Sequence, residues 1–146
     1  MTTNQPYYED VEPGDEVGPL LRTSTRDQVR AYAAVGGVNP TMGRFVSDEA
    51  ARTEGLQGMI VPGNLCMAFL SQLFTDWAGP QGRLRKLEVN FRRMVQPDDQ
   101  LTCQGIVIDK DVVDHEGQVR VDVSLENQRG EKPVIGTAVV ILPQRG

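Results

Sequence analysis

The segment GGVNPTM, residues 36–42, has the marks of a shaped loop that could hold a polar group. Two glycines followed by Asn39-Pro40 cannot continue a helix, because glycine loses backbone entropy and the residue before a proline is driven out of the helical region. Asn39 and Thr41 can form hydrogen bonds, whereas Gly37 and Met42 can neither hold nor pass a proton. The loop is therefore suited to binding or to orienting a water, but not to acid–base chemistry.

Few other side chains could act as an acid or a base. The only histidine, His115, lies in the DHEG turn between two expected strands, where we expect it to be exposed. Asp48, Glu49, Glu54 and Asp76 are the carboxylates nearest to the apolar helices, and each is more typical of a charge at a solvated helix end. We expect no catalytic role for His115.

The two cysteines, Cys66 and Cys103, lie in apolar patterns far apart in the chain. There is no CxxC pair and no histidine nearby to complete a metal site. We expect both to be small core residues in a reducing compartment, with no metal and no cofactor.

Composition limits the classes of function. The chain has 146 residues, with 15 basic against 20 acidic side chains and a net charge of −5. The densest basic run, residues 83–93, alternates with apolar residues as a half-buried strand does, so we expect no nucleic-acid partner. No apolar run approaches the roughly 20 residues that cross a bilayer. We expect one cytoplasmic domain over 1–146, frayed at 1–6 and 144–146, with no membrane partner.

The first half of the sequence predicts helices. After a short strand at 17–22, Ser24 or Thr25 can cap a helix that ends at Gly36-Gly37. Ser47 can cap a second helix that stops at Gly55. A third, of roughly 14 residues after Pro62-Gly63, is apolar around most of its circumference, so we expect a protein layer to enclose it.

The second half of the sequence predicts strands at residues 84–95, 101–113, 119–125 and 134–142. The β-branched run VIGTAVVIL at 134–142 suits an interior strand. Helices followed by a long antiparallel meander favour an α+β fold, in which a curved antiparallel sheet wraps around the one long buried helix.

This layout resembles the hotdog fold, and within it the MaoC-like family of (R)-specific enoyl-CoA hydratases and 3-hydroxyacyl-thioester dehydratases. The resemblance extends over residues 8–142. It is carried by VEPGDEV, VRAYAAVGGVNPT, the helix at 50–55, MIVPGNL, and the expected strand pair LEVNFRRMVQPDDQLTCQGIV. The DWAGP segment is also similar to small actinobacterial hydratases of steroid and fatty-acid breakdown.

The resemblance also implies where the chemistry should be. The family's reactive loop usually reads SGDxNPxH, and its Asp and His deprotonate the water that adds to the double bond. Aligning the Asn-Pro of that motif with Asn39-Pro40 puts the Asp position at Gly37 and the His position at Met42. Since an acid or base typically contributes about 10²–10⁴-fold to the rate, the loop keeps the family's shape but not its hydration chemistry.

Binding is the property that the resemblance leaves in place. In the family, backbone N–H groups at the start of the buried helix polarise the thioester carbonyl, which here means Val61, Pro62, Gly63 and Asn64. The expected substrate-binding residues are therefore these four together with Asn39, Thr41 and Met42. Met42 and Met59 could also line an acyl tunnel, although methionines near a core are more often filler.

Three functions are compatible with the sequence. In the first, the chain is a noncatalytic subunit that pairs with a homologue carrying the Asp and His and completes an acyl-CoA or acyl-carrier-protein pocket. The second is an active thioester enzyme with a relocated base, for which Asp48, Glu49, Glu54 and Asp76 are candidates. The third is a ligand-binding homodimer without turnover.

Overall fold

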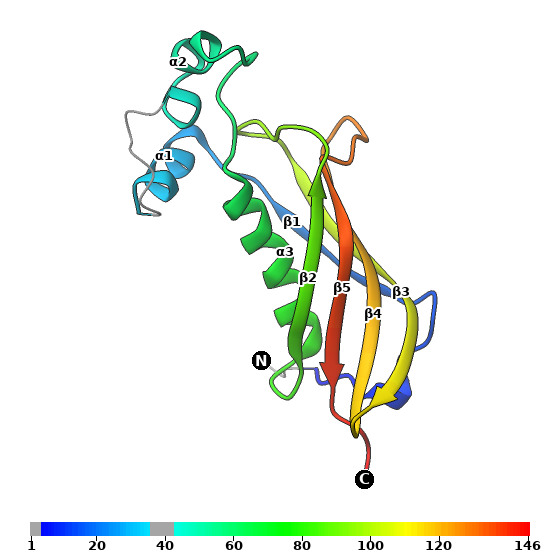
Figure 1. The fold of residues 1–146 in the computed structure, drawn as a ribbon. Helices are drawn as coiled ribbons and strands as arrows, with labels where there is room; N and C mark the ends of the chain where they lie inside the picture. Colours follow the sequence, from blue (N-terminus) through cyan, green and yellow to red (C-terminus); the bar gives the residue numbers. More distant parts are fainter. Residues whose placement is uncertain (1–3, 36–42) are drawn as a thin grey trace.

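The computed structural model describes residues 4–35 and 43–146. Five strands form one antiparallel sheet, and three helices and two short 3₁₀ turns accompany it (Figure 1). In chain order these elements are η1 (Tyr8–Asp10), β1 (Glu16–Arg22), α1 (Arg26–Val35), η2 (Gly43–Phe45), α2 (Asp48–Thr53), α3 (Gly63–Ala78), β2 (Arg83–Phe91), β3 (Leu101–Val113), β4 (Glu116–Glu126) and β5 (Val134–Leu142). The predicted α+β hotdog architecture is confirmed.

The strand order is β1-β3-β4-β5-β2, which corrects one expectation. Only β3, β4 and β5 form a meander, while β2 crosses to pair with β5 at the far edge. The expected strand pair formed by β2 and β3 is therefore wrong. Alternation predicts that a segment is a strand, but it does not identify the neighbouring strand. β5 is an interior strand, as its β-branched run predicts.

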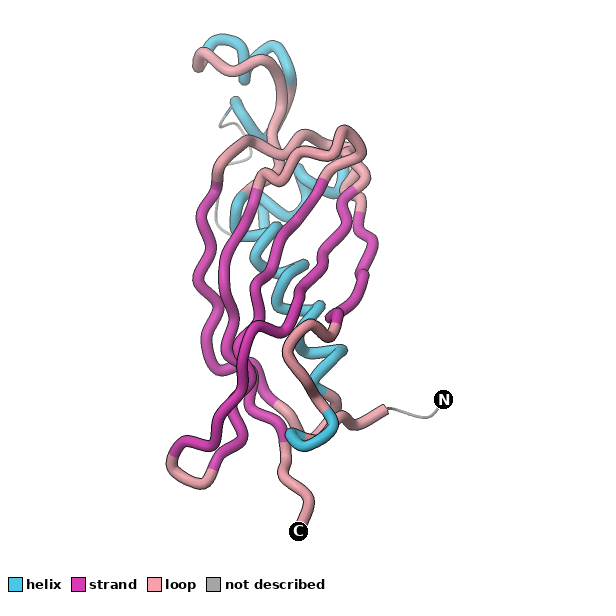
Figure 2. Tube along the Cα trace, turned by 90° about the vertical axis from the view of Figure 1, so that its right-hand side faces the viewer, coloured by secondary structure: helices cyan, strands magenta, loops and turns pink. Residues whose placement is uncertain are grey.

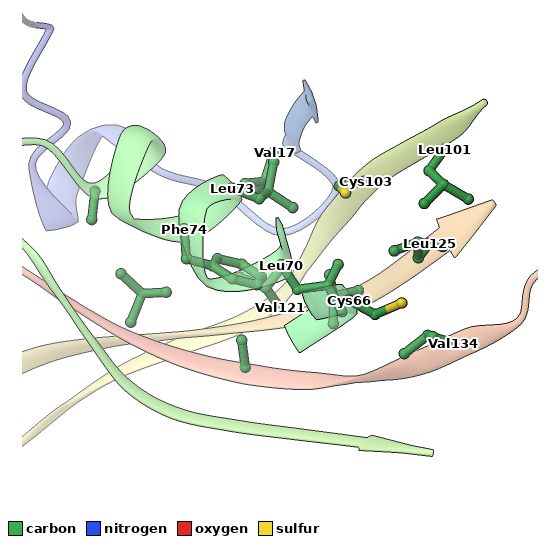
Figure 3. Close-up of a cluster of buried hydrophobic side chains, with 14 of the residues drawn as sticks. Val17, Cys66, Leu70, Leu73, Phe74, Leu101, Cys103, Val121, Leu125 and Val134 are labelled. Carbon is green, nitrogen blue, oxygen red and sulfur yellow. The ribbon is translucent and has the colours of Figure 1, made fainter. Parts of the chain in front are cut away.

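α3 lies along one face of the sheet (Figures 1 and 2). Its buried residues Cys66, Leu70, Leu73, Phe74 and Ala78 meet the inward side chains of the strands (Figure 3). In the single chain the sheet covers this side only. The other apolar side chains of α3 are half-buried or exposed in the single chain: Leu65, Met67, Ala68, Phe69 and Trp77.

Side-chain caps fix the two smaller helices where the sequence placed them. Thr25 Oγ1 accepts from the Gln28 N–H at the start of α1, and Ser47 Oγ accepts from the Ala50 N–H at the start of α2. Gly55 ends the second helix at φ +88, a conformation that favours glycine. These two helices form a lobe beyond one end of the sheet (Figure 1).

Both described chain ends contact the body of the domain. Gln5 Nε2 donates to the Ala78 carbonyl at the end of α3. Arg145 pairs with Asp10 at 2.6 Å and lies over the Tyr7 ring. The fraying expected at 1–6 and 144–146 stays a prediction.

Candidate functional site

The N-terminus of α3 presents backbone donors. Its N-cap residue is Pro62, which has no side chain that could cap the helix, and the Leu65 and Cys66 N–H groups turn back to the Pro62 carbonyl. The Gly63 and Asn64 N–H groups have no acceptor within the described part of the chain. Two donors at the positive end of a 16-residue helix favour an oxygen that carries partial negative charge.

An apolar groove of about 470 Å³ lies beside these donors. Its lining residues come from α3 and from the edge strand β2, which lie side by side in Figure 1, and from Phe45 of η2. The lining residues are Phe45, Pro62, Gly63, Asn64, Met67, Leu87, Val89 and Phe91. This combination fits a ligand with one polar carbonyl and an apolar chain.

Phe91 covers the first residue of the helix. A Cβ atom built on Gly63 would lie 3.2 Å from Cζ of the Phe91 ring. The ring is nevertheless 54% exposed, so it borders both the groove and solvent. A side chain at position 63 would therefore require the ring to shift by a few tenths of an ångström.

The structure brings together only some of the predicted binding residues. Pro62, Gly63 and Asn64 line the groove, and their contact with substrate stays a prediction. Val61 does not line the groove: it is 5% exposed, and its N–H donates to the Val95 carbonyl at 2.7 Å, so its predicted substrate contact is untested. Met59 is also buried and is core filler rather than tunnel lining. The remaining predicted positions, Gly37, Asn39, Thr41 and Met42, lie outside the described residues.

The groove residues from other elements were missed by sequence reasoning. Leu87, Val89 and Phe91 alternate along β2 and so were expected to share one face of a strand. The sequence did not indicate that this face lies beside α3, because the position of β2 depends on the strand order. Phe45 sits in a 3₁₀ turn for which the sequence carried no clear signal.

None of the eight residues lining the groove has an ionisable side chain. Asp48 instead pairs with Arg26 at 2.7 Å and accepts from the Met59 N–H at 2.9 Å. The Arg26 hydrogen bond, and then that of Met59, hold the Asp48 pKa below its usual range, which makes this carboxylate a poor base.

The other proposed acid–base groups lie away from the groove. Glu54 pairs with Arg44 at 3.0 Å, and Glu49 is exposed on α2. Asp76 is 12 residues beyond Asn64 on α3, about 18 Å along the axis. His115 occupies the turn between β3 and β4, which lies at the end of the sheet opposite to the start of α3 (Figure 1).

The described residues suggest no metal or membrane site. Within 4–35 and 43–146, no three His, Cys, Asp or Glu side chains are grouped as ligands of a metal ion. Over the same ranges, no helix has the length and apolar character needed to cross a bilayer. Both cysteines are buried free thiols, as predicted, and burial raises the pKa of Cys66 to about 12 and that of Cys103 to about 11.

Several known structures share the fold of this chain. The unliganded R-hydratase PhaJ1 from Pseudomonas aeruginosa matches with a TM-score of 0.80 and 25% identity, over 95% of this chain and 86% of that one. The (R)-hydratase from A. caviae involved in PHA biosynthesis matches at 0.76 and 22%, over 92% and 99%. The ChsH1-ChsH2 complex from Mycobacterium tuberculosis matches at 0.77 and 18%, over 90% and 98%.

The sequence itself matches one family. No curated protein sequence matches the chain significantly. The family model described as "MaoC like domain" matches residues 10–128, which is most of the chain. The chain therefore belongs to the MaoC-like hydratase and dehydratase family and has its hotdog fold.

Proposed function

We propose that this protein binds acyl thioesters in the groove beside α3 and acts as the noncatalytic subunit of a heteromeric dehydratase. The observation that carries the proposal is the pairing of two backbone donors, which have no acceptor among residues 4–35 and 43–146, with a groove that has no ionisable lining residue. The donors suit a thioester carbonyl and the groove suits an acyl chain, while proton transfer must come from elsewhere.

Hydration or dehydration needs a base near the reacting water and a proton source for the α carbon. The positions that would supply them in the family are Gly37 and Met42, neither of which can transfer a proton. A homologous partner that carries the Asp and His supplies both groups in this proposal, and the present chain supplies part of the pocket.

The edge strand β2 is where such a partner would bind. It pairs with β5 on one side only, and Leu87, Val89 and Phe91 belong both to this strand and to the groove. A second hotdog chain that adds a strand to β2 would therefore also wall the groove. The ChsH1-ChsH2 structure, a complex of two named components, is compatible with a heteromer of this kind.

The two other candidate functions have weaker support. An enzyme with a relocated base would need Asp48, Glu49, Glu54 or Asp76, and none of these lines the groove. A homodimer that binds thioesters without turnover uses the same groove and the same edge. It differs from the main proposal only in its partner, so the partner is what the experiment must vary.

Turnover of crotonyl-CoA and of a longer enoyl-CoA tests the proposal. The purified chain is assayed alone and after addition of a MaoC-like homologue that carries GDxNPxH, ideally one that copurifies with it. We expect no hydration by the chain alone and a clear gain over the homologue alone when both are present.

Two results would contradict this assignment. Hydration by the isolated chain, lost on Asp48→Asn or Asp76→Asn, would establish a relocated base. Binding of crotonyl-CoA with no effect on any homologue would identify the nonproductive homodimer.

The free thiols Cys66 and Cys103 fit a cytoplasmic location, where fatty or steroid acyl-CoA substrates are found.

A further inference from the structure

We infer that Met67 closes the inner end of the groove and sets the length of acyl chain that the protein accepts. This inference rests on the proposed function, because it takes the carbonyl to lie at the Gly63 and Asn64 donors. It adds a substrate class, short-chain acyl thioesters, and one residue that determines it.

The position of Met67 on the helix is the first observation. Met67 follows Gly63 by four residues, so the two lie on the same side of α3, one turn apart. The separation along the axis is about 6 Å, which is the length of a short acyl chain. Both residues line the groove, and Met67 is the last α3 residue that does so.

The core explains why the groove ends there. The next residues on this side of α3 are Leu70 and Ser71. Leu70 is fully buried among the strands, and neither residue borders the groove. Met67 is half-buried, and Leu70, three residues further along the helix, belongs to the packed core.

The opposite wall is apolar along its length. Phe91 lies against Gly63, and Val89 and Leu87 continue the same face of β2. A chain that starts at the donors passes these apolar side chains before it reaches Met67. Each methylene that fits should improve the dissociation constant about fourfold, and those beyond Met67 should add nothing.

Saturated thioesters test this separately from catalysis, since they have no double bond to hydrate. Butyryl-, hexanoyl-, octanoyl- and decanoyl-CoA are titrated calorimetrically into the protein, together with its partner if one copurifies. The variants are Met67→Ala, which lengthens the groove, and Met67→Phe, which shortens it. Met94→Ala is the matched control, because Met94 is an exposed methionine outside this groove.

We expect the affinity of the wild type to rise with acyl chain length and to reach a plateau by hexanoyl-CoA. Met67→Ala should move the plateau to octanoyl-CoA or beyond, Met67→Phe should move it to butyryl-CoA, and Met94→Ala should leave it unchanged. Parallel length profiles for the wild type and both Met67 variants would overturn the inference while leaving thioester binding intact. Failure of the wild type to bind any acyl-CoA would overturn the proposed function, and this inference with it.

Discussion

At the scale of single residues, the site depends on backbone atoms more than on side chains. Gly63 and Asn64, whose N–H groups have no acceptor among the described residues, line the groove, and the other lining side chains are apolar. Phe91 covers Gly63 from the strand opposite. The chemistry available to this chain is therefore set by where α3 begins.

Replacing Asn64 by proline removes one of these donors and no helical hydrogen bond, because proline is tolerated in the first turn. We expect Asn64→Pro to weaken butyryl-CoA binding about fivefold, the value of one ordinary hydrogen bond. Asn64→Ala keeps the N–H and is the control for loss of the side chain. Equal affinities of the two variants in a calorimetric titration would show that the Asn64 N–H does not contact the ligand.

Asp48 has a structural role that can be measured by pH. Its pKa is lowered in the folded protein by Arg26 and the Met59 N–H, so the stabilisation is present above the ordinary Asp pKa of about 4 and is lost as the pH falls further. We expect Asp48→Asn to lower the Tm at pH 5–7, with a gap to wild type that narrows below about pH 4.

Asp27 provides the control for this change, because it forms an exposed ion pair with Arg30 on α1 and is 93% exposed. Asp27→Asn should alter the Tm little at any pH. A Tm deficit of Asp48→Asn that is constant down to pH 2 would show that the carboxylate's charge is not what matters.

The only histidine of the sequence, His115, lies with Asp114 in the turn between β3 and β4. Both residues have positive φ, +51 and +69, in a two-residue connection between β3 and β4 that favours Asn-Gly. We expect Asp114→Asn with His115→Gly to stabilise the fold by about 1 kcal/mol in urea unfolding and to leave thioester binding unchanged. Loss of binding or activity in this double variant would give His115 a functional role.

At the scale of elements, local signals predicted the helices and tertiary packing decided the rest. The start of α1 and both ends of α2 are fixed by Thr25, Ser47 and Gly55, through interactions with residues close by in the sequence. The strand positions followed from alternation. The place of β2 beside α3 did not, because it depends on contacts with β5 nearly 50 residues later. The groove wall on β2 was missed for that reason.

The free edge of β2 has a pattern that complements itself. The Arg92 N–H bonds to the Pro133 carbonyl, so by alternation the backbone groups of Leu87 point away from β5. An antiparallel copy centred on Leu87 would place Lys86 opposite Glu88 of the second chain, twice. The chain purified alone should therefore associate through this edge, which a catalytic homologue would occupy when present.

Charge reversal tests this register. Lys86→Glu or Glu88→Lys alone puts like charges opposite each other and should weaken self-association, while a mixture of the two variants should restore it. Sedimentation velocity measures the association, and Lys132→Glu controls for the change in net charge. Wild-type association in both single variants would exclude this pairing.

At the scale of the whole molecule, the sheet covers only one side of α3. Phe69 and Trp77 remain partly exposed in the single chain, and the free edge of β2 runs along the same region. The sequence predicted that α3 is apolar around most of its circumference. The sheet of the single chain covers only one side of the helix. This surplus apolar surface is consistent with a second chain beside β2.

The buried thiols report on the stability of the whole fold. Burial raises the pKa values of Cys66 and Cys103 to about 12 and about 11, so little thiolate forms at neutral pH. We expect almost no reaction with a thiol reagent in the native state and stoichiometric reaction of both in denaturant. Rapid labelling of the native protein at pH 7 would reveal an opening that exposes the face of α3 packed on the sheet.

The contact between Gly63 and Phe91 also has a consequence for sequence evolution in related proteins. The ring lies 3.2 Å from the place of a Cβ atom at position 63, so a side chain there requires the exposed ring to shift by a few tenths of an ångström. A smaller side chain at 91 removes this requirement. Related chains should therefore show correlated substitutions at these two sites, which are 28 positions apart, and the allowed combinations should mark changes in the ligand.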